Sequence, residues 1–330
     1  MTTGDRPGPG DEAPAGQGDQ RRAEPEAGAT DDPTGAVAFE SARPKLFGVA
    51  YRMTGSVADA EDCCQEAWLR WQRTDRALVR NPEAWLVRAT TRLAIDRQRS
   101  AQHRREAYVG PSLPEPLVLG PLDRATPPSD GDPESAAELA DSLTLAFLVL
   151  LDELTPDDRA VLLLHDVFGY DFDEVAAAVG RSPAACRQAA SRVRRRLGER
   201  DAGSAVRSHP GADERAVLDR LLAALLTGDV TGVLDLLAPD VVELNDGGPS
   251  RRAARRPIVG ADRVARLLVN LASRAPTGTS VDLVRVNELP GLVLRIDGRP
   301  DLVMSVQLDA DSRIRRIWVQ LNPDKLAHLT

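Results

Sequence analysis

The chain has 330 residues, of which 42% are hydrophobic and 28% charged, and its formal net charge is −8. This composition is typical of a soluble protein of two or three domains. No apolar run approaches the roughly 20 residues of a membrane helix, and the N-terminus does not resemble a signal peptide, so we expect no membrane association. Three cysteines allow no disulfide framework, and 4% aromatic residues argue against a base-stacking platform. A reducing compartment is therefore expected.

The charge is unevenly distributed along the chain. Residues 1–32 hold eight acidic residues and three arginines among many Gly, Pro and Ala residues, so residues 1–35 are predicted to be a disordered acidic tail. Residues 130–174 are again acidic, whereas residues 88–105 and 187–200 are basic. Basic helices within an acidic chain indicate local contact with a polyanion.

Residues 36–106 are predicted to form an all-α bundle. Apolar residues at helical spacing indicate a first helix through Leu46 and Met53, with Pro44 in its first turn or at a kink. Ser56 can cap a second helix. Pro82 suits the first turn of a third helix. The buried face of this third helix would consist of Trp85, Ala89 and Leu93.

A second all-α unit is predicted at residues 136–201, after a proline-rich linker at residues 107–135 without periodicity. It ends in two short helices, a Gly-containing turn and a basic helix from Pro183, the order of a helix-turn-helix. The residues expected to contact DNA on this helix and its turn are Arg181, Ser182, Arg187, Gln188, Ser191, Arg192 and Arg195. Arg suits guanine edges and Gln suits adenine edges. The alternative is a solvated basic helix end.

The last third, residues 202–330, changes pattern. Two helices with leucine stripes precede period-two runs such as Leu302-Met304-Val306, which are separated by Asp-Gly and Asp-Ser turns. Helices followed by an antiparallel sheet predict a separate α+β domain.

Two stretches resemble extracytoplasmic-function sigma factors of the sigma-70 family. The sequence DAEDCCQEAWLRW, from Asp59, and the sequence NPEAWLVRATTRLAIDRQR, from Asn81, resemble their region 2. The segment 157–200 resembles their region 4. The resemblance implies a region-2 bundle and a region-4 helix-turn-helix that bind core RNA polymerase, at the β′ clamp and the β flap, and promoter DNA.

The resemblance also implies roles for residues of the first unit. The polymerase-binding residues would be Asp59, Glu61, Asp62, Gln65, Glu66 and Leu69, an acidic face with one apolar anchor. The residues at the minus-ten promoter element would be Arg88, Arg92, Asp96, Arg97 and Arg99. The region-4 helix would read the upstream, minus-thirty-five element. For the acidic face, the alternative is simple solvation.

The C-terminal third resembles a SnoaL-like domain, a curved sheet wrapped by helices into a cone, which some of these sigma factors carry. Three short segments match that subgroup and imply regulatory contacts of Leu113, Pro114, Glu115, Asp246, Gly247, Gly248, Asn322, Pro323, Asp324 and Lys325. We hypothesise that the arginine-rich segment 251–256 and residues 322–325 clasp the linker at Leu113, Glu115 and Leu117. The domain would thereby control engagement with polymerase.

The interpretation is therefore an alternative sigma factor with a fused regulatory domain, acting in the cytoplasm at the nucleoid through RNA polymerase. No enzymatic activity, catalytic residue, cofactor or metal is expected, while an unknown small ligand in the C-terminal cavity is considered. The main alternative is a helix-turn-helix regulator with a ligand-binding domain that acts without polymerase. Another is a SnoaL-type enzyme with a DNA-binding appendage. Cys64 and Cys186 are expected in the core, with Cys63 lateral and a candidate redox switch.

Overall fold

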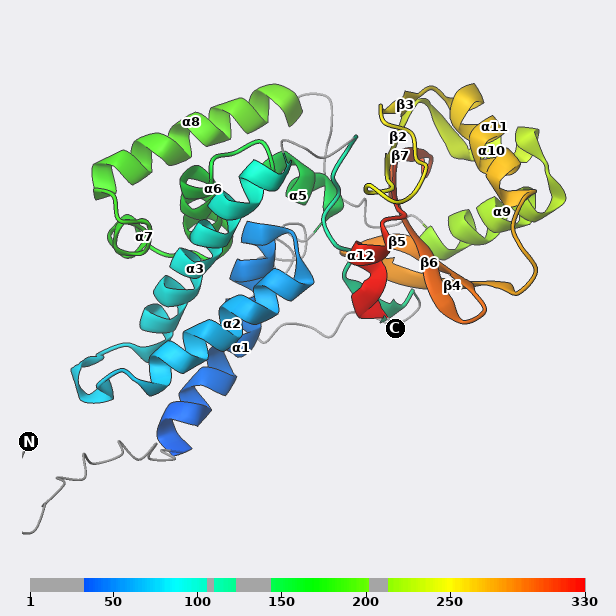
Figure 1. Ribbon diagram of the computed structural model, residues 1–330. Helices are drawn as coiled ribbons and strands as arrows, with labels where there is room; N and C mark the ends of the chain where they lie inside the picture. Colours follow the sequence, from blue (N-terminus) through cyan, green and yellow to red (C-terminus); the bar gives the residue numbers. More distant parts are fainter. Residues whose placement is uncertain (1–32, 106–109, 123–143, 202–212, 330) are drawn as a thin grey trace, which may run out of the picture.

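The computed structural model describes residues 33–105, 110–122, 144–201 and 213–329. Two helical units lie beside a C-terminal domain built on one sheet (Figure 1). Most of the predicted acidic tail, part of the linker and the start of the second unit lie outside the described residues. Among the described helices, none combines the length and the apolarity needed to cross a membrane.

The first helical unit consists of α1 (Pro33–Thr54), α2 (Val57–Gln72), a short 3-10 turn η1 (Arg76–Leu78) and α3 (Pro82–Arg105). Local signals define its boundaries. Gly55, at φ +68°, ends α1, and the Ser56 hydroxyl accepts the Asp59 N–H at 3.1 Å to cap α2. Pro44 lies inside α1 and not in its first turn, because the helix already begins at Pro33, ahead of the apolar stripe that starts at Leu46.

The buried face of α3 differs from the prediction. Ala89 is buried, but Trp85 and Leu93 are only partly so, and Leu86, Thr90 and Ala94 are fully buried instead. The reason is that α3 contacts α1 and α2 and also the second helical unit. A helix packed on several sides buries residues outside a single stripe.

The second helical unit contains α5 (Leu145–Leu151), α6 (Pro156–Leu162), a π-helical turn η2 (Leu163–Val167), α7 (Phe172–Val179) and α8 (Pro183–Asp201). Asp171 and Glu174 form a capping box at the start of α7. Gly180, at φ +77°, ends α7. The Ser182 hydroxyl accepts the Ala185 N–H at 3.2 Å and thereby caps α8.

The two helical units share one hydrophobic core. Arg159 of α6, only 1% exposed, joins them by donating to the carbonyl oxygen of Met53 in α1 at 2.6 Å. The same guanidinium donates to the carbonyl of Leu151 at 2.9 Å and pairs with Asp152 at 2.6 Å. A buried cation is tolerated here because its donors have partners.

The C-terminal domain has helices α9 (Glu214–Thr227), α10 (Val230–Leu236) and α11 (Ala261–Ala272), and ends with α12 (Pro323–Leu326) and a 3-10 turn η3 (Ala327–Leu329). Its strands are β2 (Leu237–Asp246), β3 (Ile258–Val259), β4 (Thr279–Val286), β5 (Leu289–Ile296), β6 (Arg299–Leu308) and β7 (Ile314–Gln320). With β1 (Val118–Pro121) they form one sheet in the order β1-β4-β5-β6-β7-β2-β3. Its inner face packs on α9, α10 and α11, which gives the predicted SnoaL-like α+β fold.

The sheet corrects two expectations. It is mixed and not antiparallel, because β2 pairs in parallel with β7, a long-range pairing that leaves no local signal. Part of the linker is also regular: β1 pairs antiparallel with β4, with Val118 opposite Val286. The Gly and Pro residues of β1 argue against a strand in the sequence, but proline is tolerated on an edge strand.

The Arg159 bridge generates a stability prediction. Replacing Arg159 with Met should lower the free energy of unfolding by about 3 kcal/mol or more, because it leaves carbonyl oxygens and the Asp152 carboxylate without their donor. Arg196→Met is the matched control, because Arg196 is 56% exposed and its nearest acid, Glu153, lies 3.8 Å away; its effect should stay within about 0.5 kcal/mol. Equal effects in urea unfolding would contradict the assignment.

Candidate functional site

The outer face of α8 is open. Arg187, Gln188, Ser191, Arg192 and Arg195 are all exposed, while Cys186, Ala189 and Val193 face the core. The Arg187 guanidinium lies over the Phe172 ring at 5.6 Å, which orients it without burying it. A capped helix with cations along one exposed side is suited to lie in a DNA groove.

Two residues predicted beside this face have internal partners. Arg181 pairs with Asp157 and Asp158, each at 3.0 Å, and these contacts raise the pKa of its guanidinium against the opposing effect of burial. Ser182 is used as the helix cap. Both therefore have a structural role in fixing the start of α8.

The predicted polymerase-binding residues lie on α2. Asp62, Gln65 and Leu69 are exposed, and Leu69 exposes 47% of its surface, unusual for a leucine on a helix. The remaining residues are partly buried, and Glu61 and Glu66 pair with Arg43 and Arg70 respectively. Asp59 and Asp62 share Arg97 of α3, at 3.0 and 3.1 Å. The outer face of α2 is thus acidic with one apolar side chain at its end.

The predicted minus-ten residues of α3 are not equally free. Arg92 donates to the carbonyl oxygens of Ala177 and Ala178 in α7, at 2.8 and 3.1 Å. Arg99 pairs with Asp157 of α6 at 2.8 Å, and Arg97 pairs within the first unit. Asp96 is exposed and Arg88 is partly exposed. Two cations of this set are therefore held by the second helical unit.

The linker residues 112–117, here called the linker segment, dock on the start of α2. The Glu115 carboxylate accepts the Val57 N–H at 2.6 Å and the Ser56 hydroxyl at 2.8 Å. Its main chain is held by Gly55 and by the Tyr51 hydroxyl, at 2.8 and 2.6 Å. A carboxylate at a helix N-terminus satisfies free N–H groups and complements the helix dipole.

The other side of the linker segment docks on the C-terminal domain. The Asp246 carboxylate accepts the Leu113 N–H at 2.8 Å, and the Lys325 ammonium donates to Asp246 at 2.8 Å, to the Ser112 hydroxyl at 2.9 Å and to the Leu113 carbonyl. The Asp246 side chain is wholly buried. The Leu113 side chain packs with Trp318, Leu289 and α5.

Several residues of this contact had no signal in the sequence. Asn287, in the β4–β5 turn at φ +48°, binds Leu117 through both its N–H and its side-chain oxygen, and donates to the Tyr51 hydroxyl at 2.8 Å. The Gln320 amide donates to the Pro114 carbonyl at 3.3 Å, and His328 lies 2.9 Å from the Pro116 carbonyl. Only folding brings these residues together.

Only some of the residues predicted to make regulatory contacts meet in the structure. Leu113, Glu115, Asp246 and Lys325 meet directly, and Pro114 is buried with them. Asn322 caps α12, packs against Gly248 and holds Lys325 in place, while Pro323 and Asp324 are exposed. Of the hypothesised clasp, Lys325 holds the linker at Ser112 and Leu113. The part assigned to the arginine side chains is wrong: Arg251 pairs with Asp301 at 2.6 Å, and no hydrogen bond or ion pair joins Arg252, Arg255 or Arg256 to a described linker residue.

The expectation for Cys63 is also wrong. Its side chain is fully buried, and burial raises the pKa of its thiol to about 11, despite the nearby Arg97. Cys64 and Cys186 are buried as expected. A protonated, buried thiol is a poor redox switch.

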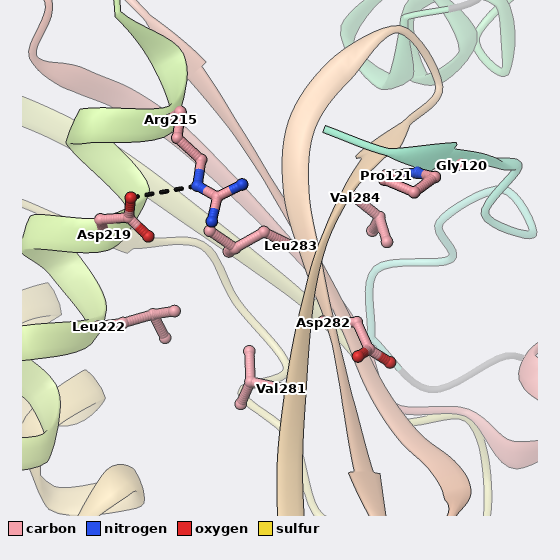
Figure 2. A pocket seen from close by; sticks show the side chains of 9 residues that line it. All are labelled: Gly120, Pro121, Arg215, Asp219, Leu222, Val281, Asp282, Leu283 and Val284. Carbon is pink, nitrogen blue, oxygen red and sulfur yellow. Dashed lines mark hydrogen bonds and ion pairs between the residues drawn. The ribbon is translucent and has the colours of Figure 1, made fainter. Parts of the chain in front are cut away.

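A groove of about 560 Å³ lies beside strand β4 (Figure 2). Leu222 of α9 and Val281 and Leu283 of β4 line it, and Asp219 pairs with Arg215 at 3.1 Å along its wall. The groove also reaches Gly120 and Pro121 at the end of β1. Asp282 also lines the groove and pairs with Arg295 at 3.2 Å, so both carboxylates of its wall are engaged by arginines of the same domain.

The comparisons with known proteins agree with this arrangement. Residues 38–104 match the family model of sigma-70 region 2, and residues 144–197 match that of region 4. The chain is 39% identical to the ECF RNA polymerase sigma factor SigJ of Mycobacterium tuberculosis, over 87% of this chain and 91% of that one. It is 32% identical to "Probable ECF RNA polymerase sigma factor SigI" of the same species, over 74% and 79% of the two chains. The crystal structure of M. tuberculosis SigJ superposes with a TM-score of 0.67 at 36% identity, over 88% of this chain and 98% of that one.

Two helical units with these matches define a sigma-70 type initiation factor. The chain belongs to the extracytoplasmic-function group of that family. It is an alternative sigma factor, which binds core RNA polymerase and promoter DNA to initiate transcription. Proteins of this family are initiation factors and not catalytic enzymes. The first helical unit is region 2 and the second is region 4.

Proposed function

We propose that this sigma factor contacts the β′ clamp of polymerase through the outer face of α2 and the β flap through region 4. The observation that supports the first contact is the exposed Leu69 beside Asp62 and Gln65, an apolar anchor on an acidic face. None of the described residues of region 4 or of the C-terminal domain forms a hydrogen bond or ion pair with these three side chains. Such a face suits a basic surface. Acting with core polymerase, the protein works in the cytoplasm at the nucleoid.

Promoter recognition is divided between two helices with different accessibility. The exposed face of α8 supports a role in reading the upstream element. The α3 face, proposed for the minus-ten element, holds Arg92 and Arg99 against region 4. Engaging the minus-ten element with these arginines therefore requires region 4 to move away from α3.

We propose that the C-terminal domain controls this step through the linker segment. The segment joins region 2 at Ser56 and Val57 to the C-terminal domain at Asp246 and Lys325. Leu113 adds a contact to α5 of region 4. A domain that touches all three parts restrains their separation, and because the contact is intramolecular, weak interactions suffice.

The α8 face can be tested by DNA binding. Arg187→Ala or Arg192→Ala should raise the Kd for the upstream element by about 5–150-fold, the equivalent of about 1–3 kcal/mol for a base contact. Arg220→Ala, an exposed arginine of α9, is the control. Equal weakening on scrambled DNA with a shallower salt dependence would indicate phosphate contacts, and unchanged binding would remove α8 from the interface.

The α2 face can be tested by polymerase binding. Asp62→Lys with Glu66→Lys should abolish capture of core polymerase, because two cations would meet the basic clamp. Asp235→Lys with Asp311→Lys reverses the same charge at exposed positions of the C-terminal domain and should leave capture unchanged. Retained capture by the α2 variant, with an unchanged circular dichroism spectrum, would refute this interface.

The linker contact can be tested by run-off transcription at equal polymerase occupancy. Lys325→Met removes the ammonium from Asp246, Ser112 and Leu113, and should raise transcription severalfold by loosening the restraint. Arg313→Met removes one exposed charge from the same domain and should not. If Lys325→Met and removal of residues 324–330 both leave output unchanged, the domain does not control initiation.

A further inference from the structure

A pocket of about 530 Å³ lies beneath the loop that follows β2. Asn245 and residues 247–255 line it. The loop has a fixed shape: a Cβ on Gly247 would lie 2.6 Å from the carbonyl oxygen of Arg251, and Gly248, at φ +60°, packs against Asn322. The pocket is therefore built into the fold, and its size is in the range of small-molecule sites.

The pocket carries a positive charge that the protein does not neutralise. Residues 247–260 contain four arginines and no acidic residue. Arg251 is neutralised by Asp301, with both guanidinium nitrogens on that carboxylate at 2.6 and 3.2 Å. Arg252 and Arg255 line the pocket, are exposed, and form no ion pair with any described residue. Two guanidinium groups thus remain available to a bound anion.

A polar side chain forms the inner wall. Asn245 is only 5% exposed and donates its amide N–H to the Glu243 carboxyl at 2.8 Å. The amide nitrogen is thereby engaged, and no described residue donates a hydrogen bond to the Asn245 side-chain oxygen. Glu243 is wholly buried on the same side of β2, its second carboxyl oxygen has no described partner, and burial raises its pKa. A buried polar atom without a partner lowers stability, so its presence in this pair calls for an explanation.

The pocket adjoins the linker contact. Asn245 directly precedes Asp246, which binds Leu113 and Lys325. On the other side, a Cβ on Gly110 of the linker would come within 3.4 Å of the Arg255 main chain. A ligand bound in the pocket would therefore lie next to both ends of this contact.

We infer that this pocket binds a small phosphorylated organic molecule, with Arg252 and Arg255 on the phosphate and the Asn245 oxygen accepting a hydroxyl or amino group. The planar guanidinium fork matches phosphate oxygens, and two forks suit a multiply charged anion. The binding itself does not depend on the proposed contact with polymerase. An effect of the ligand on transcription would rest on the proposed function.

Calorimetric titration of the full chain with ATP, pyrophosphate and citrate tests the inference. Saturable ATP binding that is about tenfold or more weaker in an Arg252→Ala, Arg255→Ala variant supports the site, because each lost guanidinium removes a charged hydrogen bond. ATP should bind more tightly than pyrophosphate, which has no ribose hydroxyl or base amino group to donate to the Asn245 oxygen. The control is Arg263→Ala with Arg274→Ala, two exposed arginines elsewhere in the domain.

Three results would overturn the inference. The first is no saturable binding of ATP or pyrophosphate, and the second is citrate binding as tightly as ATP. The third is equal ATP affinity in the Arg252→Ala, Arg255→Ala variant; if that variant also loses affinity for duplex DNA, the loop is a contact for the DNA backbone. None of these measurements contains polymerase, so their failure leaves the proposed function standing.

Discussion

The arrangement of the whole chain depends on one short extended segment, residues 112–117, held on both sides. On one side the Glu115 carboxylate completes the N-terminus of α2, and on the other the buried pair of Asp246 and Lys325 holds the main chain at Leu113. A buried carboxylate is stable here because an ammonium and a main-chain N–H compensate its charge. Removing Asp246 or Lys325 leaves the other charge without compensation, so the interactions at Leu113 depend on each other.

The surfaces proposed to contact promoter DNA and polymerase differ in how accessible they are. The faces of α8 and α2 are open to solvent, whereas Arg92 and Arg99 of α3 are bound to region 4. The contact of Arg92 with two carbonyl groups at the end of α7 is favourable, because a helix C-terminus attracts a cation. DNA phosphates or bases must compete with it. The restraint from the linker segment adds to the direct packing of regions 2 and 4, whose shared core includes Arg159.

Local chemistry in the sequence predicted much of the fold. Ser56, Pro82 and Ser182 begin helices as expected, because capping depends on a few adjacent residues. The alternating runs in β6 and β7 likewise predicted strands. The parallel pairing of β2 with β7 was not predictable, because register between distant segments leaves no local pattern.

The functional residues divide in the same way, into those that local sequence predicted and those that only the fold brings together. The exposed row on α8 was visible from helical periodicity, whereas the acidic side of α2 was assigned from the resemblance to region 2. The partners of Arg92 were not, since they are main-chain oxygens of a helix some 85 residues away. Neither Asn287 nor Gln320 stands out in the sequence, because their role depends on the turn and strand that deliver them to the linker segment.

The central claim is that the linker segment fixes the C-terminal domain on region 2. Pulsed electron paramagnetic resonance between spin labels at two exposed positions, Arg73 after α2 and Asn270 in α11, tests this most directly. The account predicts one narrow distance distribution in the otherwise unchanged protein. It predicts a broader and longer one when Glu115→Gln and Lys325→Met are introduced together. The same narrow distribution in both proteins would contradict the account.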